Sequence, residues 1–498
     1  MRSSSLVVVV ALVSCSHKEE PKAKAEPNKV VETAPAPKKP VPTAPLPGLA
    51  ADPGGATGKP IWQTAFGGLG IDAPRGVAVG PDGSVYVVGY FDGEIDFGGT
   101  IGKKPSVGGS DAFVAKLSPD GKLVWAQTWG SKRDDAANAI AVKGDKVVVV
   151  GNFLDTVKFG EFSKASVGSD DAFVVELDTS GDVKWAWNMG GIDSDGANAV
   201  AASPDGGWII GGSFSDSIDI GSAHLKSNGR TDAFLAKLAA TGDLEWVKAY
   251  GGRYDDTIMH VATDSNGNVY IQGHFKDQVS FGGKPLKAGG GSDNDVVLAK
   301  YDTNGDHVWS QRFGNAFNDA AGGIAIDPAG HITMVGSFDK SVSFGEGDDH
   351  TSLGEADAFI ARLTTDGKLE WAKTFGAERE DIAWGVASDA SGNTVTTGWF
   401  QGTVDFGKGA VTSKGNKDVF AVKLDPKGNT VWVQTWGDHD HDQGRGLALD
   451  DKGNAIVVGL FRFSLALMDP PLQSKKDDND PVLSKAPKPD AFVVKLSR

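Results

Sequence analysis

Short apolar runs bounded by turn residues recur along the chain from residue 61 to the C-terminus. Proline followed by Asp-Gly separates many neighbouring runs, because proline presets φ and glycine accepts a positive φ. Runs of four to eight residues between such turns predict an antiparallel meander of strands rather than helices. In the first repeat the predicted strands are 76–79, 84–89, 111–117 and 122–128.

A tryptophan at the start of every fourth run marks a repeat of 60 to 63 residues. A fixed period of this length indicates one supersecondary unit packed against copies of itself. Four strands in each of seven copies predict an all-β fold, a seven-bladed β-propeller of four-stranded antiparallel blades. We expect the marker tryptophans to pack one blade on the next. They are Trp62, Trp125, Trp185, Trp246, Trp309, Trp371 and Trp432.

The two ends of the repeat region predict how the ring closes. The region opens with Ile61-Trp62, which matches the fourth strand of a repeat, and ends with Asp490 to Leu496, which matches the third. We therefore expect an N-terminal strand to complete the last blade, an arrangement that removes two exposed sheet edges.

Two sequences, Asp111-Ala-Phe-Val-Ala-Lys-Leu117 and Pro119-Asp-Gly-Lys-Leu-Val-Trp125, return with small changes in the other repeats. They resemble the bacterial β-propeller repeat of extracytoplasmic proteins, over residues 61–498. The repeats also resemble, more weakly, the tryptophan-docking repeats of quinoprotein propellers, and the resemblance is strongest at residues 240–246. Most repeats lack the Thr-Gly pair of that family, which argues against a quinone cofactor.

Two aspartates recur in each repeat, one ten residues after the tryptophan and one opening the third strand. Because the turns of a meander alternate between its two ends, we expect both sets on one face. Each carboxylate can cap its loop by accepting backbone N–H bonds; the alternative is a hard cation such as Ca²⁺ between paired carboxylates. Candidate ligands for that cation are Asp72, Asp111, Asp135 and Asp171, and no other cofactor is expected.

Glycine five residues after the tryptophan and the motif Gly-x-Phe that closes the second strand are also shared, and we interpret both as framework. The positions that vary between repeats on the same face are where recognition is expected. Aromatic residues with arginines are typical of a protein or glycan contact surface. The candidate binding residues are Tyr90, Arg133, Arg253, Tyr254, His274, Phe317, Arg379, Trp384, Trp399, His439, His441 and Arg445.

The first 60 residues predict an export signal and a tether. Residues 1–15 carry a minimal positive start, an apolar run too short to span a bilayer, and Leu12-Val13-Ser14-Cys15, which resembles a bacterial lipobox with Cys15 as the lipidated residue. Residues 16–60 are rich in proline, alanine and lysine, and we expect a disordered tether before the propeller of residues 61–498. The resemblance to tethered lipoproteins implies an outer-membrane anchor, with the propeller facing the periplasm or the cell surface.

The formal charge of −16 and the pI near 5.0 argue against a nucleic-acid partner. A single cysteine excludes disulfides within the chain and cysteine-based zinc sites. No motif of a known catalytic constellation is present, so we do not expect an enzyme. The leading hypothesis is a monomeric, membrane-anchored module that binds an envelope protein or a polysaccharide on its loop face. The alternatives are a scaffold for envelope assembly and a propeller lyase or hydrolase.

Overall fold

The computed structural model describes residues 57–290, 293–345, 347–475 and 487–498, all as strands, turns and loops with no helix among them. The predicted lipidation site at Cys15 and the tether up to residue 56 lie outside this part. Within it, no helix is long and apolar enough to cross a membrane.

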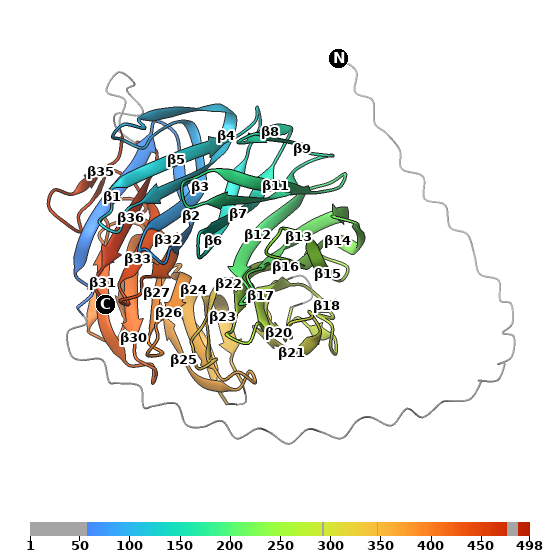
Figure 1. The fold of residues 1–498 in the computed structure, drawn as a ribbon. Helices are drawn as coiled ribbons and strands as arrows, with labels where there is room; N and C mark the ends of the chain where they lie inside the picture. Colours follow the sequence, from blue (N-terminus) through green and yellow to red (C-terminus); the bar gives the residue numbers. More distant parts are fainter. Residues whose placement is uncertain (1–56, 291–292, 346, 476–486) are drawn as a thin grey trace, which may run out of the picture. The chain divides into compact units, whose positions relative to one another are not determined.

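Every repeat forms an antiparallel meander of four strands, with the first strand innermost and the fourth outermost (Figure 1). Within the blades the second and third strands are almost entirely buried, because neighbouring sheets cover both of their faces, and the inner and outer strands are partly exposed. The inner strands are β2 (Asp72–Val79), β6 (Ala136–Lys143), β12 (Asp195–Ala202), β16 (Thr257–Thr263), β22 (Asp319–Ile326), β26 (Ile382–Ser388) and β32 (Gln443–Leu449). The second strands are β3 (Val85–Asp96), β7 (Lys146–Phe153), β13 (Trp208–Ile220), β17 (Val269–Phe275), β23 (Ile332–Ser343), β27 (Thr394–Phe400) and β33 (Ala455–Phe461). The third strands are β4 (Lys103–Leu117), β10 (Asp171–Asp178), β14 (Ala223–Leu238), β20 (Asp295–Tyr301), β24 (Asp349–Leu363), β30 (Asp418–Leu424) and β36 (Asp490–Leu496). The outer strands are β5 (Leu123–Trp129), β11 (Val183–Met189), β15 (Leu244–Tyr250), β21 (His307–Phe313), β25 (Leu369–Phe375), β31 (Thr430–Trp436) and β1 (Pro60–Gly68).

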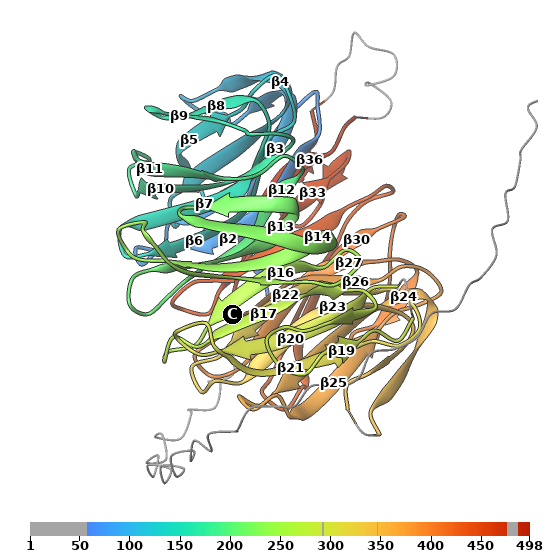
Figure 2. The ribbon, with the colours of Figure 1, turned by 90° about the vertical axis from the view of Figure 1, so that its right-hand side faces the viewer.

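The inner strands surround a central channel. Each contacts the inner strand of the next repeat, and β32 contacts β2, so the ring of inner strands is closed. Figure 2 shows β12, β16, β22 and β26 side by side along this inner wall. The predicted β-propeller architecture is therefore confirmed.

The prediction of seven separate blades is wrong in one respect. Over the described residues the structure has five separate four-stranded blades, and the strands expected to form the first and the last blade belong to one eight-stranded sheet. The cause is β1, which pairs with β36 as predicted and then continues past it to pair with β3 at Gly67–Asp96 and Gly68–Ile95. The equivalent contact between β11 and β13 is a single bridge, Gly190–Asp219, and leaves those two blades separate.

The closing strand starts earlier than the sequence suggested. The N–H of Thr57 donates to the carbonyl of Arg498 at 3.0 Å, and Ser497 donates to the carbonyl of Lys59 at 2.8 Å. Residues 57–60 therefore already pair with the end of the chain, so the ordered propeller begins before residue 61. Phe66 in β1 is 1% exposed and anchors the strand in the core.

The connection between the second and third strands is more regular than a loop. In three repeats the two strands run on past the blade as a hairpin, and in the other four a separate two-stranded ribbon forms at the same place. An apolar residue in each ribbon, such as Val157 or Val279, is 1% exposed and extends the core beneath the loop face. The separate ribbons are β8 (Thr156–Phe159) with β9 (Phe162–Ala165), β18 (Gln278–Val279) with β19 (Leu286–Lys287), β28 (Thr403–Asp405) with β29 (Ala410–Thr412), and β34 (Ser464–Leu465) with β35 (Leu472–Gln473).

The marker tryptophans join neighbouring repeats. Trp125 donates its indole N–H to the carbonyl of Thr179 at 3.1 Å, and its ring lies on Gly181, which has φ of +98°. A Cβ at Gly181 would approach the indole to 3.2 Å, so glycine provides both the turn conformation and the space for the ring. Gly58 lies on Trp432 in the same way, across the junction between the two ends of the chain.

Candidate binding site at the channel mouth

A β-bulge in each inner strand directs one side chain into the channel. In β2 the pairing with β3 passes from Pro74 to Gly76, so Arg75 has no partner in the ladder. The same bulge recurs in every inner strand, three residues after the aspartate that follows the marker tryptophan by ten residues. We call these aspartates the first set, and those that open the third strands the second set. A bulge bends the strand and changes the direction of the extra side chain. The bulge residues are Arg75, Asn138, Asn198, Met259, Gly322, Trp384 and Arg445.

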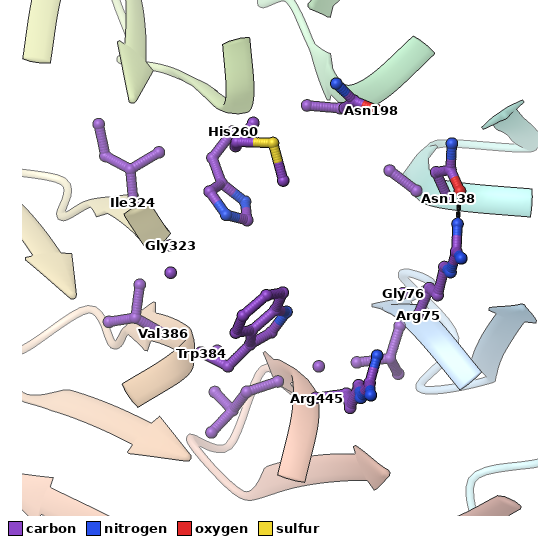
Figure 3. Close-up of a pocket in the computed structure, with 18 of the residues that line it drawn as sticks. Arg75, Gly76, Asn138, Asn198, His260, Gly323, Ile324, Trp384, Val386 and Arg445 are labelled. Atoms are coloured by element: carbon purple, nitrogen blue, oxygen red, sulfur yellow. Dashed lines mark hydrogen bonds between the residues drawn. The ribbon is translucent and has the colours of Figure 1, made fainter. Parts of the chain in front are cut away.

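The bulge residues and the two positions that follow each of them line a cavity of about 440 Å³ (Figure 3). The position directly after the bulge is glycine or alanine in every strand except β16, where it is His260. The next position is apolar in every strand and forms an apolar ring. That ring consists of Val77, Ile140, Val200, Val261, Ile324, Val386 and Leu447.

Two arginines lie side by side on one wall of this cavity (Figure 3). The guanidinium of Arg75 donates to the Oδ1 of Asn138 and lies over the ring of Tyr90, 4.7 Å from its centroid. Arg445 donates from Nη2 to the side-chain oxygen of Gln443 at 2.8 Å, and its Nε is buried without a partner. Burial lowers the pKa of both arginines, and the charge of Arg75 lowers that of Arg445 further.

Aromatic side chains form another wall. Trp384 stacks on Trp399, with ring centroids 5.7 Å apart and an angle of 28° between the planes. The ammonium group of Lys417 lies over the ring of Trp399, 5.0 Å from its centroid. Lys417 and the indole N–H of Trp399 both donate a hydrogen bond to Glu380. These contacts fix Trp399, which in turn holds the Trp384 indole in the cavity.

Two histidines on adjacent strands lie deep in the channel wall. Burial lowers the pKa of His260 and of His274 to about 4. The repulsion between the two rings is a further cause for His260, and Lys276 adds to the shift of His274. The N–H of Ala321 donates to Nδ1 of His274 at 3.4 Å, as expected for a neutral imidazole. Above pH 5 both rings are therefore uncharged.

The first aspartate set holds the loops around the mouth. In Asp442, Oδ2 accepts the N–H of Asp438 at 2.9 Å, and Oδ1 accepts the N–H of Arg462 at 3.1 Å. The bond from the residue four places earlier is present in all seven members of the set. Each member also donates its own N–H to the carbonyl of the residue directly before the second aspartate of the neighbouring repeat. The structure thus shows the loop-capping role for this set.

The second aspartate set lies directly against the first. A Cβ at Gly130 would come within 2.0 Å of the carboxyl carbon of Asp111, so this shared glycine makes room for the carboxylate. Burial raises the pKa of both sets, to about 6 for Asp111 and Asp135 and to about 9 for Asp72. Repulsion within each pair adds to the shift, for example from Asp490 on Asp72. A carboxyl that keeps its proton can donate to its partner, which relieves that repulsion.

The four predicted metal ligands do not form one site. Asp111 and Asp135 form a pair, whereas Asp72 pairs with Asp490 and Asp171 with Asp195. Among the described residues, no group of three or more histidine, cysteine, aspartate or glutamate side chains is placed to hold a metal ion. Ca²⁺ between paired carboxylates and loop carbonyls remains a hypothesis for chelation to test.

The predicted binding residues divide between the channel and the rim. Tyr90, His274, Trp384, Trp399 and Arg445 gather in or beside the cavity. The others lie on separate loops. Arg133 faces Asp155 at 4.0 Å, Arg253 lies over the ring of Tyr254 at 5.7 Å, and Phe317 is 44% exposed. His439 lies on Phe463 at 4.5 Å, His441 approaches Asp440, and Arg379 lines a separate pocket.

Sequence reasoning missed Arg75, Asn138, Asn198 and His260. For the first three a signal was available, because the position three residues after the first aspartate changes between repeats that are otherwise alike. It runs Arg, Asn, Asn, Met, Gly, Trp, Arg, and small residues flank it in most repeats.

No protein-family model matches the sequence. Regulatory protein FlaEY of Caulobacter vibrioides is 27% identical over 45% of the chain, and a WD repeat-containing protein of Acanthamoeba polyphaga mimivirus is 20% identical over 80% of it. Both relatives are longer proteins, of which this chain spans 24% and 36%.

Several solved propellers resemble the structure. The WD40 domain of Neurospora crassa Pan2 matches 89% of this chain and 98% of its own, with 8% identity and a TM-score of 0.46. Sqt1 from Chaetomium thermophilum matches 81% of this chain and 83% of its own, with 11% identity and a TM-score of 0.39. A gluconolactonase from Xanthomonas campestris matches 71% of this chain and 90% of its own, with 12% identity and a TM-score of 0.31. The fold assignment rests on the strand pairing of the chain itself.

Proposed function

We propose that the chain is a binding module that is lipid-anchored at Cys15 and docks a partner protein of the cell envelope over the mouth of its channel. The observation that carries the proposal is the bulge ring. A framework repeated in every inner strand directs two arginines, two asparagines, a methionine and a tryptophan into one cavity, with glycine at the seventh position. A purely structural channel has no need of this asymmetry, whereas recognition of a partner requires it.

Binding fits the mouth better than catalysis does. The seven carboxyls of the first set have the raised pKa values that an acid or base catalyst needs, but each is at most 3% exposed and cannot reach a substrate. Their pKa values run from about 6 to about 9 without a gap, so no carboxyl stands apart from its equivalents. The groups that do reach the cavity are guanidinium, amide, imidazole and indole, which suit recognition.

Site-specific photo-cross-linking in the producing cell tests this proposal. A photoreactive phenylalanine analogue replaces Phe317, which is 44% exposed on a loop at the mouth. The matched control carries it at Val308, which is 51% exposed at the far end of an outer strand. We expect a discrete protein adduct from position 317, absent from position 308 and lost when Trp384 is replaced by alanine. Adducts of equal yield at both positions, or an adduct that survives Trp384→Ala, would refute the proposal.

A further inference from the structure

The two arginines of the channel differ from most of the buried cations of this protein. At the opposite end of the blades, four buried lysines and an arginine are each paired with an aspartate, and a further buried lysine, Lys300, lies over the ring of Tyr270, 5.1 Å from its centroid. These pairs are Lys116 with Asp82 at 3.9 Å, Lys237 with Asp205 at 2.5 Å, Arg362 with Asp327 at 2.6 Å, Lys423 with Asp389 at 3.2 Å, and Lys495 with Asp450 at 2.9 Å. Among the residues that the structure describes, no carboxylate lies within ion-pair distance of Arg75 or Arg445.

Neutral groups hold the two guanidinium groups in place. Asn138, Gln443 and the ring of Tyr90 fix their orientation without neutralising their charge. Two like charges in a partly dehydrated cavity repel each other, and such a pair is costly unless an anion joins it. The chain has 65 acidic residues and a formal charge of −16, yet it places none of them here. The positive charge of the two arginines is therefore available to pair with an anionic ligand.

The apolar ring indicates what carries the anion. Two residues after the bulge, every inner strand presents valine, isoleucine or leucine to the cavity, and Trp384 lies on β26, the strand next to that of Arg445. An oligosaccharide would bring hydroxyl groups against this ring, where they find no hydrogen-bond partners. A peptide can present a carboxylate to the arginines and an adjacent apolar side chain to the ring. A cavity of about 440 Å³ has room for side chains of this size.

We propose that Arg75 and Arg445 together form the receptor for a carboxylate of an acidic peptide segment whose neighbouring apolar side chain enters the apolar ring. The proposal rests on the protein-binding function above and defines the chemistry of its partner. The planar guanidinium forks suit a carboxylate, which accepts two parallel N–H bonds from each. Because Arg75 is exposed to the channel and Arg445 is half-buried, the partner reaches Arg75 first.

The test is selection of a random dodecapeptide library on the full-length chain and, in parallel, on the double variant Arg75→Gln, Arg445→Gln. Selected peptides are then titrated by fluorescence anisotropy. We expect the wild type to enrich peptides with aspartate or glutamate, or a free C-terminus, next to valine, leucine or isoleucine. The double variant should bind them at least about tenfold more weakly, as expected for the loss of charge-assisted hydrogen bonds. The control Lys122→Gln, Lys368→Gln removes two exposed cations from turns between third and outer strands, at the opposite end of the blades, and should leave affinity unchanged.

The thermal unfolding midpoint shows that the double variant folds, and we expect it to be unchanged or higher, because two like charges are removed. Enriched peptides without acidic residues, or peptides bound equally by the double variant, would overturn the inference and leave the proposed function standing. Binding of an oligouronate that the double variant loses, without any peptide selected, would assign the arginines to an acidic glycan instead. Selection of neither class would overturn the inference, and the cross-linking result would then decide the proposed function separately.

Discussion

The substitution Asp319→Asn tests whether the loop-capping carboxyls are protonated in the folded protein. Asp319 is 2% exposed; its Oδ2 accepts the N–H of Asn315 at 3.2 Å, and its Oδ1 is buried without a partner. Burial raises its pKa from 3.8 to about 8, with repulsion from Asp295 and Asp339 as further causes. Asparagine keeps the acceptor for Asn315 and adds an N–H₂ group that can donate to the neighbouring carboxylate.

The pKa shift fixes both the sign and the size of the expected effect. A carboxyl whose pKa is higher in the folded state stabilises the fold fully below pH 4, and this contribution is lost as the pH rises through about 8. Between pH 5 and pH 8 the native carboxyl keeps the proton that the unfolded chain has lost. At about 1.4 kcal/mol per pH unit, Asp319 alone lowers the free energy of unfolding by ~4 kcal/mol over this range.

The assay is urea unfolding of wild type and Asp319→Asn at pH 5, 6, 7 and 8, followed by tryptophan fluorescence. We expect similar stability at pH 5, and a variant more stable than wild type at pH 8 by up to ~4 kcal/mol. Asp243→Asn, which removes an exposed turn carboxylate, controls for the change in net charge and should follow the wild-type curve. Parallel curves for wild type and Asp319→Asn would show that the carboxyl is ionised in the fold and that the reasoning is wrong.

Three further predictions concern packing and metal. Gly121 has φ of +83° and a Cβ there would lie 2.6 Å from an indole, so Gly121→Ala should lower the free energy of unfolding in urea by about 2–4 kcal/mol. Gly144→Ala is the control: Gly144 has φ of +62° and open space around it, so the loss should be only about 1–2 kcal/mol. Equal losses would contradict the tryptophan–glycine contact. Phe66→Ala should lower the free energy of unfolding by about 3–5 kcal/mol because its side chain is 1% exposed, whereas Ile61→Ala should lower it by less than about 1 kcal/mol because that side chain is 46% exposed. A Phe66→Ala variant as stable as wild type would show that β1 does not close the propeller. EDTA should leave the thermal midpoint unchanged if the paired aspartates only cap loops, and a midpoint that falls with EDTA and returns with Ca²⁺ would establish the cation instead.

The sequence by itself determined the repeat, the strand order within it and the closing strand. Each of these depends on local signals that recur along the chain: turn residues between apolar runs, a tryptophan every 60 to 63 residues, and ends that match the fourth and third strands of a repeat. The same comparison of repeats separated the shared aspartates from variable positions such as Trp384 and Arg445. Local propensity and periodicity are enough for these features, because they are properties of a single repeat.

Only the tertiary structure decided which variable residues meet. A side chain in a strand points to one face or the other according to register, and a single extra residue changes its direction, so the sequence alone did not place Arg75 or Asn138 in the channel. Closure of the ring then brings Arg75 next to Arg445, although 370 residues separate them in the chain. The joining of two blades through β1 is decided in the same way, by how far one strand extends past its partner once the sheets are packed.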